Sequence, residues 1–92
     1  REHNLINAVR YLSSSGIKVL AASEKATQNY SDISMTEPVA IVMGAEDEGV
    51  SPEILRMCDE MMRIPMLGTI DSLNVSVAAG VLIYEAVRQR KL

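Results

Sequence analysis

One apolar run that ends in a glycine loop constrains the fold of this chain more than any other stretch. Residues 39–43 are all apolar, and Gly44, three acidic residues and Gly49 follow them directly. A continuous apolar run of this length is typical of a strand covered on both faces, as in a parallel sheet. Ser51 and Pro52 then suit the N-cap and first position of a helix. The stretch therefore predicts a buried strand with a tight loop at its carboxyl end, where open α/β sheets bind ligands.

The other segments alternate between helical and extended patterns. Leu5, Val9 and Leu12 share one face of a first helix, which Gly16 ends. The residues between the first two strands form a long polar connection, with a short helical turn expected at residues 24–28. The expected helices are residues 4–15, 51–59 and 72–90, and the expected strands are residues 17–22, 39–43 and 61–65. This order predicts an α/β layer structure with a parallel sheet.

Length and charge limit the class of protein. Ninety-two residues make one domain at most. A net charge of −3 argues against nucleic-acid binding by electrostatics alone. Cys58 is the only cysteine, so no internal disulfide can form, and a reduced, cytoplasmic setting is expected. No apolar run approaches the ~20 residues that a membrane span requires.

The last expected helix, residues 72–90, is apolar nearly all round until its basic end. Such a helix is buried nearly all round. Because one small domain can hardly cover both sides of it, a homodimer contact along this helix is expected.

A second loop, residues 66–71, follows the strand that Pro65 ends, and Asp71, Ser72 and Asn74 lie at the start of the last helix. If both loops leave the same edge of a parallel sheet, they form one crevice. The first loop lacks the Lys-Ser/Thr of a phosphate-binding loop, and its carboxylates would repel phosphate. A nucleoside or a sulfonium is the better ligand. A solvated turn in the first loop and an ordinary helix cap in the second remain the alternative.

Other candidate sites have simpler explanations. His3 has no metal-ligand companions, so no metal site is expected. Cys58 lies among apolar residues without a base beside it, and it is interpreted as part of the core.

The two loops together resemble a known family. Residues 42–51, VMGAEDEGVS, are similar to the second signature of the SpoU (TrmH-like) RNA ribose 2′-O-methyltransferases, an apolar strand followed by G-S-E-x-x-G-L. Residues 63–66, RIPM, and residues 71–80, DSLNVSVAAG, are similar to the third signature, I-P-M and then S-L-N-V-S-x-A. The resemblance covers essentially the whole chain.

The resemblance implies a fold and an activity. It implies that residues 1–92 are the C-terminal part of a methyltransferase domain with a deep trefoil knot, incomplete at its N-terminus. It also implies a homodimer through the last helix, S-adenosylmethionine as cofactor and rRNA or tRNA as substrate. The reaction would be an in-line attack of a ribose 2′-hydroxyl on the sulfonium methyl group.

Site residues follow from the matching positions of the signatures. The residues expected to shape the catalytic site or to orient a catalytic arginine are Glu46, Ser72 and Asn74. The residues expected to bind the cofactor, largely through their main chain, are Met43, Gly44, Ala45, Gly49, Ile64, Met66, Leu73 and Asn74.

This sequence also departs from the family pattern. Ala45 stands where serine is common, and the first signature, which carries an asparagine and the catalytic arginine, is absent. The resemblance thus implies that the chain alone is inactive and that RNA binds largely outside it. Two alternatives stay open: a non-catalytic knotted dimerisation or regulatory module, and a generic nucleotide-binding α/β domain.

Overall fold

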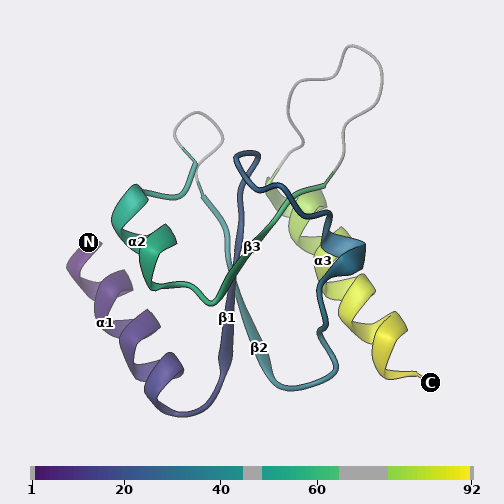
Figure 1. Ribbon diagram of the computed structural model, residues 1–92, viewed down its shortest axis with the longest axis horizontal. Helices are drawn as coiled ribbons and strands as arrows, with labels where there is room; N and C mark the ends of the chain where they lie inside the picture. Colours follow the sequence, from purple (N-terminus) through teal and green to yellow (C-terminus); the bar gives the residue numbers. More distant parts are fainter. Residues whose placement is uncertain (1, 45–48, 65–74, 92) are drawn as a thin grey trace.

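The computed structural model describes residues 2–44, 49–64 and 75–91 (Figure 1). The elements in chain order are α1 (Glu2–Ser14), β1 (Lys18–Ala22), the 3-10 turn η1 (Tyr30–Asp32), β2 (Val39–Val42), α2 (Pro52–Met57), β3 (Glu60–Met62) and α3 (Val75–Arg90). Among the described helices, none is long and apolar enough to cross a membrane.

The three strands form one parallel sheet in the order β2-β1-β3. Leu20 at the centre pairs with Ile41 on one side and with Glu60 on the other. Because all strands run the same way, they end at one edge of the sheet, which is called the carboxyl edge below. The predicted α/β architecture with a parallel sheet is confirmed.

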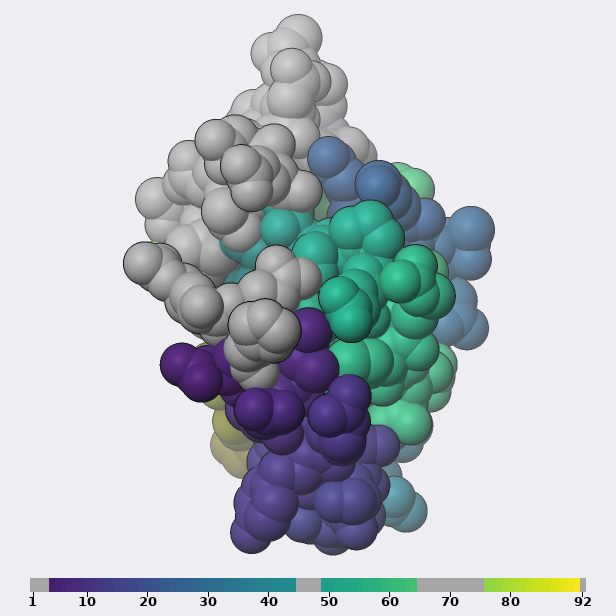
Figure 2. All heavy atoms as spheres, turned by 90° about the vertical axis from the view of Figure 1, so that its left-hand side faces the viewer, coloured from purple at the N-terminus to yellow at the C-terminus, as the bar shows by residue number. Residues whose placement is uncertain are grey.

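Helices cover both faces of the sheet. Figure 1 shows α1 and α2 on one side of the strands and η1 and α3 on the other, and Figure 2 shows α1 and α2 side by side. Successive residues of β1 point to opposite faces. Val19 therefore packs with Val9 and Ile54 of α1 and α2, whereas Leu20 packs with Leu82 of α3.

The first helix differs slightly from the prediction. It begins at Glu2, and its inward stripe consists of Ile6, Val9 and Leu12, whereas Leu5 is 41% exposed. Ile6 thus takes the place of Leu5 in the inward stripe. Both residues fit the helical period, because Val9 and Leu12 lie three and six positions after Ile6 and four and seven positions after Leu5. Gly16 has the predicted left-handed conformation, with φ of 83°.

The connections follow the expected signals in part. Ser51 caps α2, and its Oγ accepts a hydrogen bond from the Ile54 N–H at 3.3 Å. The helical turn expected at residues 24–28 lies instead at Tyr30–Asp32. Strand β3 spans Glu60–Met62, shorter than expected, because its pairing with β1 ends at Met62, opposite the last residue of β1, Ala22.

Helix α3 is buried on one side only within a single chain. Ala78, Leu82, Glu85 and Ala86 face the core. Its exposed apolar side chains are Val77, Ile83, Tyr84 and Val87. The expected burial on all sides is therefore not met by this chain alone.

Candidate functional site

The expected cofactor residues that the structure describes lie at the carboxyl edge. Met43 and Gly44 directly follow β2, and Ile64 follows β3. Strand β1 separates β2 from β3, so these residues flank the end of the central strand. The residues from which the two predicted loops leave the sheet, Gly44 and Ile64, thus lie at the same edge.

Gly44 closes the base of the first loop. A Cβ added to Gly44 would lie 2.6 Å from the Cα of Gly49 and would also overlap the main chain at Val50. Gly49 itself has φ of 71°, which side chains rarely adopt. Each glycine is therefore required for a different reason, close approach at Gly44 and backbone conformation at Gly49.

The site faces α3 rather than α1. Met43 and Ile64 are half-buried, and both pack against the cluster that contains Leu20, Met62 and Leu82. Val42 points the other way and packs against the cluster beneath α1 and α2. The strand period thus places Met43 and Ile64 in one apolar wall on the α3 side.

Six of the expected residue positions lie outside the described residues. They are Ala45, Glu46, Met66, Ser72, Leu73 and Asn74. Their roles therefore stay predictions.

The connection at residues 28–30 fixes the chain directly after β3. The Arg63 N–H donates to the Gln28 carbonyl at 2.9 Å, and the Tyr30 N–H donates to the Arg63 carbonyl at 2.8 Å. Asn29 and Arg63 pair as an isolated parallel bridge. The sequence analysis missed this contact, because the polar connection carries no period that indicates pairing.

A hydrogen-bonded cluster joins the end of α3 to residues 33–37. Gln89 Nε2 donates to the Ile33 carbonyl at 2.9 Å, and the Met35 N–H donates to Gln89 Oε1 at 2.6 Å. Arg90 donates to the carbonyls of Met35 and Glu37 at 3.0 Å and 2.8 Å. This cluster holds α3 on the connection that leads into β2.

Glu85 supports the same cluster. Arg88 binds its carboxylate with two hydrogen bonds, of 2.9 Å and 2.7 Å, and Gln89 Nε2 donates a third at 2.9 Å. These side-chain hydrogen bonds from Arg88 and then Gln89 lower the pKa of Glu85 to about 2, against the opposing effect of its burial. Glu85 is therefore ionised and paired at neutral pH.

An open depression of about 420 Å³ lies between η1 and α3. Its lining residues are Tyr30, Gly80, Val81, Tyr84, Glu85 and Arg88. None of the described residues expected to bind a cofactor lines it, and Glu85 is already occupied by Arg88 and Gln89. The depression continues the exposed apolar side of α3.

Two further features concern potential metal ligands and the single cysteine. Within residues 2–44, 49–64 and 75–91, no group of three potential metal ligands occurs. Cys58 packs against the cluster beneath α1 and α2, and burial, with Asp59 beside it, raises the pKa of its thiol. A raised pKa suppresses the reactive thiolate, which suits a core residue.

Comparison with known proteins gives a consistent result. The model of the SpoU rRNA Methylase family matches residues 1–84. A 23S rRNA (guanosine-2′-O-)-methyltransferase, RlmB, of a Burkholderia species is 46% identical over 87 residues. That match covers 95% of this chain and 35% of the relative, so the chain spans about a third of that relative's length.

Solved structures agree in fold. A crystal structure of an RNA 2′-O ribose methyltransferase has a TM-score of 0.88 and 38% identity, with 94% of this chain and 33% of that chain covered. An AdoMet-bound rRNA methyltransferase from Sinorhizobium meliloti has a TM-score of 0.82 and 32% identity, with 89% of this chain and 32% of that chain covered. With the family model matching more than nine-tenths of its length, this chain belongs to the SpoU rRNA methylase family.

Proposed function

We propose that this chain forms the S-adenosylmethionine-binding part of an RNA ribose 2′-O-methyltransferase that acts on rRNA or tRNA. The observation that supports the proposal is the position of Gly44 and Ile64, which lie at the carboxyl edge on opposite flanks of β1 where the two signature stretches leave the sheet. Parallel α/β sheets bind ligands at this edge. The likeness to an AdoMet-bound rRNA methyltransferase supports the choice of cofactor.

The described residues fit such a cofactor. The required absence of a Cβ at Gly44 leaves main chain, rather than side chain, at the end of β2. Met43 and Ile64 contribute apolar side chains on the α3 side of the edge. A ligand with an apolar body and hydrogen-bonding groups is suited to such a mixture of main chain and apolar surface.

The cofactor supplies an activated methyl group on a positively charged sulfur. In the proposed reaction Met43, Gly44, Ala45 and Gly49 bind it from the first loop. From the second stretch, Ile64, Met66, Leu73 and Asn74 bind it.

We assign the roles of shaping the site and of orienting a catalytic arginine to Glu46, Ser72 and Asn74. Positioning the ribose hydroxyl in line with the methyl group supplies much of the acceleration.

A second copy of this chain is the proposed partner along α3. Val77, Ile83, Tyr84 and Val87 expose apolar surface on this helix, and the depression beside Tyr84 continues it. Contiguous exposed apolar surface is typical of protein interfaces. The homodimer explains why a helix that is apolar nearly all round faces water in one chain.

Two further parts of the proposal rest on the family resemblance. The first is a trefoil knot at the C-terminal end, formed where the segment between β3 and α3 passes through the chain before it. The second is a cytoplasmic location, where rRNA and tRNA substrates occur.

Isothermal titration calorimetry with S-adenosylhomocysteine tests the cofactor assignment on the intact protein. We expect stoichiometric binding. No heat of binding at millimolar ligand contradicts the proposed function.

A further inference from the structure

We propose that Arg63 binds a phosphate group of the RNA substrate at the carboxyl edge of the sheet. This inference rests on the proposed function, and it adds a phosphate-binding role for one residue of this chain.

The main chain at Arg63 is held in place on both sides. Its N–H donates to the Gln28 carbonyl at 2.9 Å, and its carbonyl accepts from the Tyr30 N–H at 2.8 Å. The neighbouring residues Met62 and Ile64 both pack into the α3-side cluster. The Cα of Arg63 is therefore fixed relative to the sheet, although the residue lies beyond the last residue of β3.

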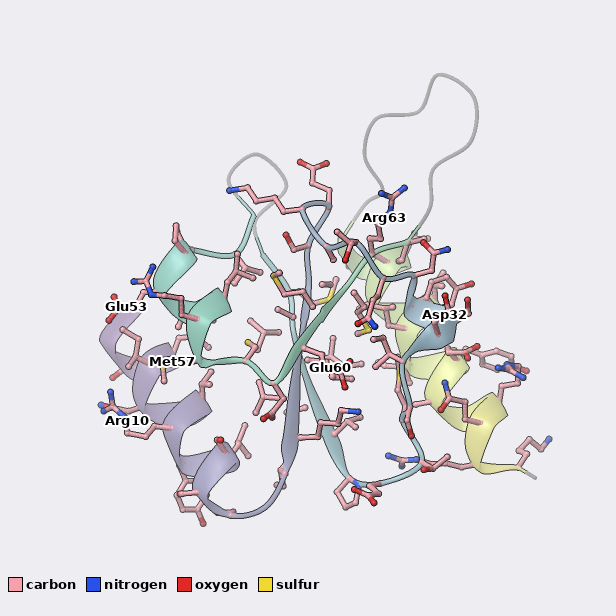
Figure 3. The ribbon with its side chains drawn as sticks, viewed as in Figure 1. Arg10, Asp32, Glu53, Met57, Glu60 and Arg63 are labelled. Carbon is pink, nitrogen blue, oxygen red and sulfur yellow. The ribbon has the colours of Figure 1, made fainter. Side chains whose placement is uncertain are left out.

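The side chain of Arg63 points away from this core. Because Met62 and Ile64 face α3, the strand period directs Arg63 to the other side of the chain. The residue is exposed, and Figure 3 shows its guanidinium group projecting above the end of β3. Within the described residues it makes no ion pair and no side-chain hydrogen bond.

Three of the other cations have structural partners. Lys18 pairs with Glu60 at 2.9 Å, Arg88 pairs with Glu85 at 2.7 Å, and Arg90 donates to two main-chain carbonyls. Their charges are used to hold the fold together. Arg63 supports no such contact in the described part of the chain, so its charge is available to a ligand.

The position of Arg63 links it to the proposed site. It directly precedes Ile64, which flanks the end of β1 opposite Gly44. Lys25 is also exposed after β1, and it directly follows Glu24 in the sequence. Arg10 lies on the outer side of α1, away from the carboxyl edge (Figure 3).

Arginine is suited to this role. Its planar guanidinium group donates two parallel hydrogen bonds to a phosphate, and it stays charged at every relevant pH. The chain carries a net charge of −3, so it offers RNA no general electrostatic attraction. An arginine whose main chain is fixed at this edge, across β1 from Gly44 where the acidic first loop begins, would orient the RNA backbone next to the ribose that is methylated.

The test compares Arg63→Gln and Arg63→Lys with Arg10→Gln in the intact protein. Binding of a fluorescein-labelled stem-loop RNA transcript is measured by anisotropy over a range of salt concentrations, and S-adenosylhomocysteine binding is measured by calorimetry. For Arg63→Gln we expect roughly fivefold weaker RNA binding at about 0.1 M salt, and a log K versus log salt slope smaller by about 0.7, the value for one phosphate contact on a single strand.

Arg63→Lys keeps the charge, so it should retain the salt slope while losing part of the affinity. Arg10→Gln should leave both the RNA affinity and the salt slope unchanged. Unaltered RNA affinity and slope in Arg63→Gln contradict the proposal. So does weaker binding of S-adenosylhomocysteine with RNA binding intact, since that result assigns Arg63 to the cofactor carboxylate.

Different results would contradict the proposed function and the assignment of Arg63. If the wild-type protein binds no S-adenosylhomocysteine, the cofactor site itself is wrong, whatever Arg63 does. If the wild-type protein binds the cofactor and Arg63→Gln binds RNA as tightly as the wild type, only the assignment of Arg63 is wrong.

Discussion

Met35 and Gln89 are joined across the fold by a hydrogen bond of 2.6 Å from the Met35 N–H to Gln89 Oε1, although 54 positions separate them. The same side-chain amide donates to the Ile33 carbonyl at 2.9 Å. Gln89 thus satisfies a main-chain donor and a main-chain acceptor of the segment that leads into β2. Because Met35 is fully buried, water does not replace these bonds easily.

Gln89→Ala is therefore expected to lower the free energy of unfolding by about 1–3 kcal/mol, the usual cost of leaving buried polar groups without partners. Urea denaturation followed by circular dichroism measures the change. Lys91→Ala, in an exposed residue at the end of the same helix, serves as the control and should change stability little. Equal stability of the two variants contradicts the role of Gln89.

The second prediction concerns acid stability. Hydrogen bonds from Arg88 and Gln89 lower the pKa of Glu85 from 4.5 to about 2 in the folded chain. The stabilisation from the ionised carboxylate is thus fully present above the unfolded pKa of 4.5, and it is lost as the pH falls toward about 2.

Glu85→Gln should remove this part of the pH dependence, so its stability should fall less steeply with acid over that range. Denaturation curves at several pH values measure the slope. Glu53→Gln, in an exposed carboxylate of α2, is the matched control and should keep the wild-type slope. A wild-type slope in Glu85→Gln shows that the ion pair does not depress this pKa.

The third prediction concerns the first loop. Gly44→Ala places a Cβ against the main chain at Gly49 and Val50, so the base of the loop must open. We expect roughly tenfold or weaker binding of S-adenosylhomocysteine, which corresponds to a loss of about 1.4 kcal/mol. Calorimetry measures the affinity.

The control separates this loss from general instability. Gly16→Ala strains a left-handed residue, with a cost of roughly 1–2 kcal/mol, at the amino end of β1. It should lower stability but leave cofactor affinity unchanged. Equal losses of affinity in both variants would falsify the specific role of Gly44.

The fourth prediction concerns the second copy. Tyr84 on α3 is 75% exposed and lines the depression, whereas Tyr11 on α1 is 71% exposed and does not. If α3 forms the dimer contact, Tyr84→Glu should weaken the free energy of association by about 2 kcal/mol. The dissociation constant of the dimer should then rise roughly thirtyfold.

Tyr11→Glu introduces the same charge at an equally exposed tyrosine and should leave the dimer intact. Sedimentation velocity over a dilution series measures both. A wild-type monomer at all concentrations, or equal effects of both variants, contradicts the proposed interface.

Local sequence signals were sufficient for most of the helices and strands. The apolar run at residues 39–43, the cap at Ser51 and the left-handed Gly16 act through neighbouring residues, and the structure confirms the strand, the cap and the glycine conformation. The strand was expected to be buried, but β2 is half-buried because it lies beside β1 on the outside of the described sheet. The inward face of α1 was misassigned by one residue, because Leu5 and Ile6 both fit the helical period. Periodicity alone does not distinguish them, since the sheet beneath decides which one is covered.

The sequence by itself determined the alternation of elements, the two glycine positions and the two signature stretches, because these depend on local backbone preference and on residue type. The tertiary structure alone decided the strand order β2-β1-β3, the placement of Met43 and Ile64 in one wall, and the contacts of Gln28 and Gln89. These are pairings between distant segments, and each depends on which surfaces are buried together. No spacing within one segment specifies such a pairing.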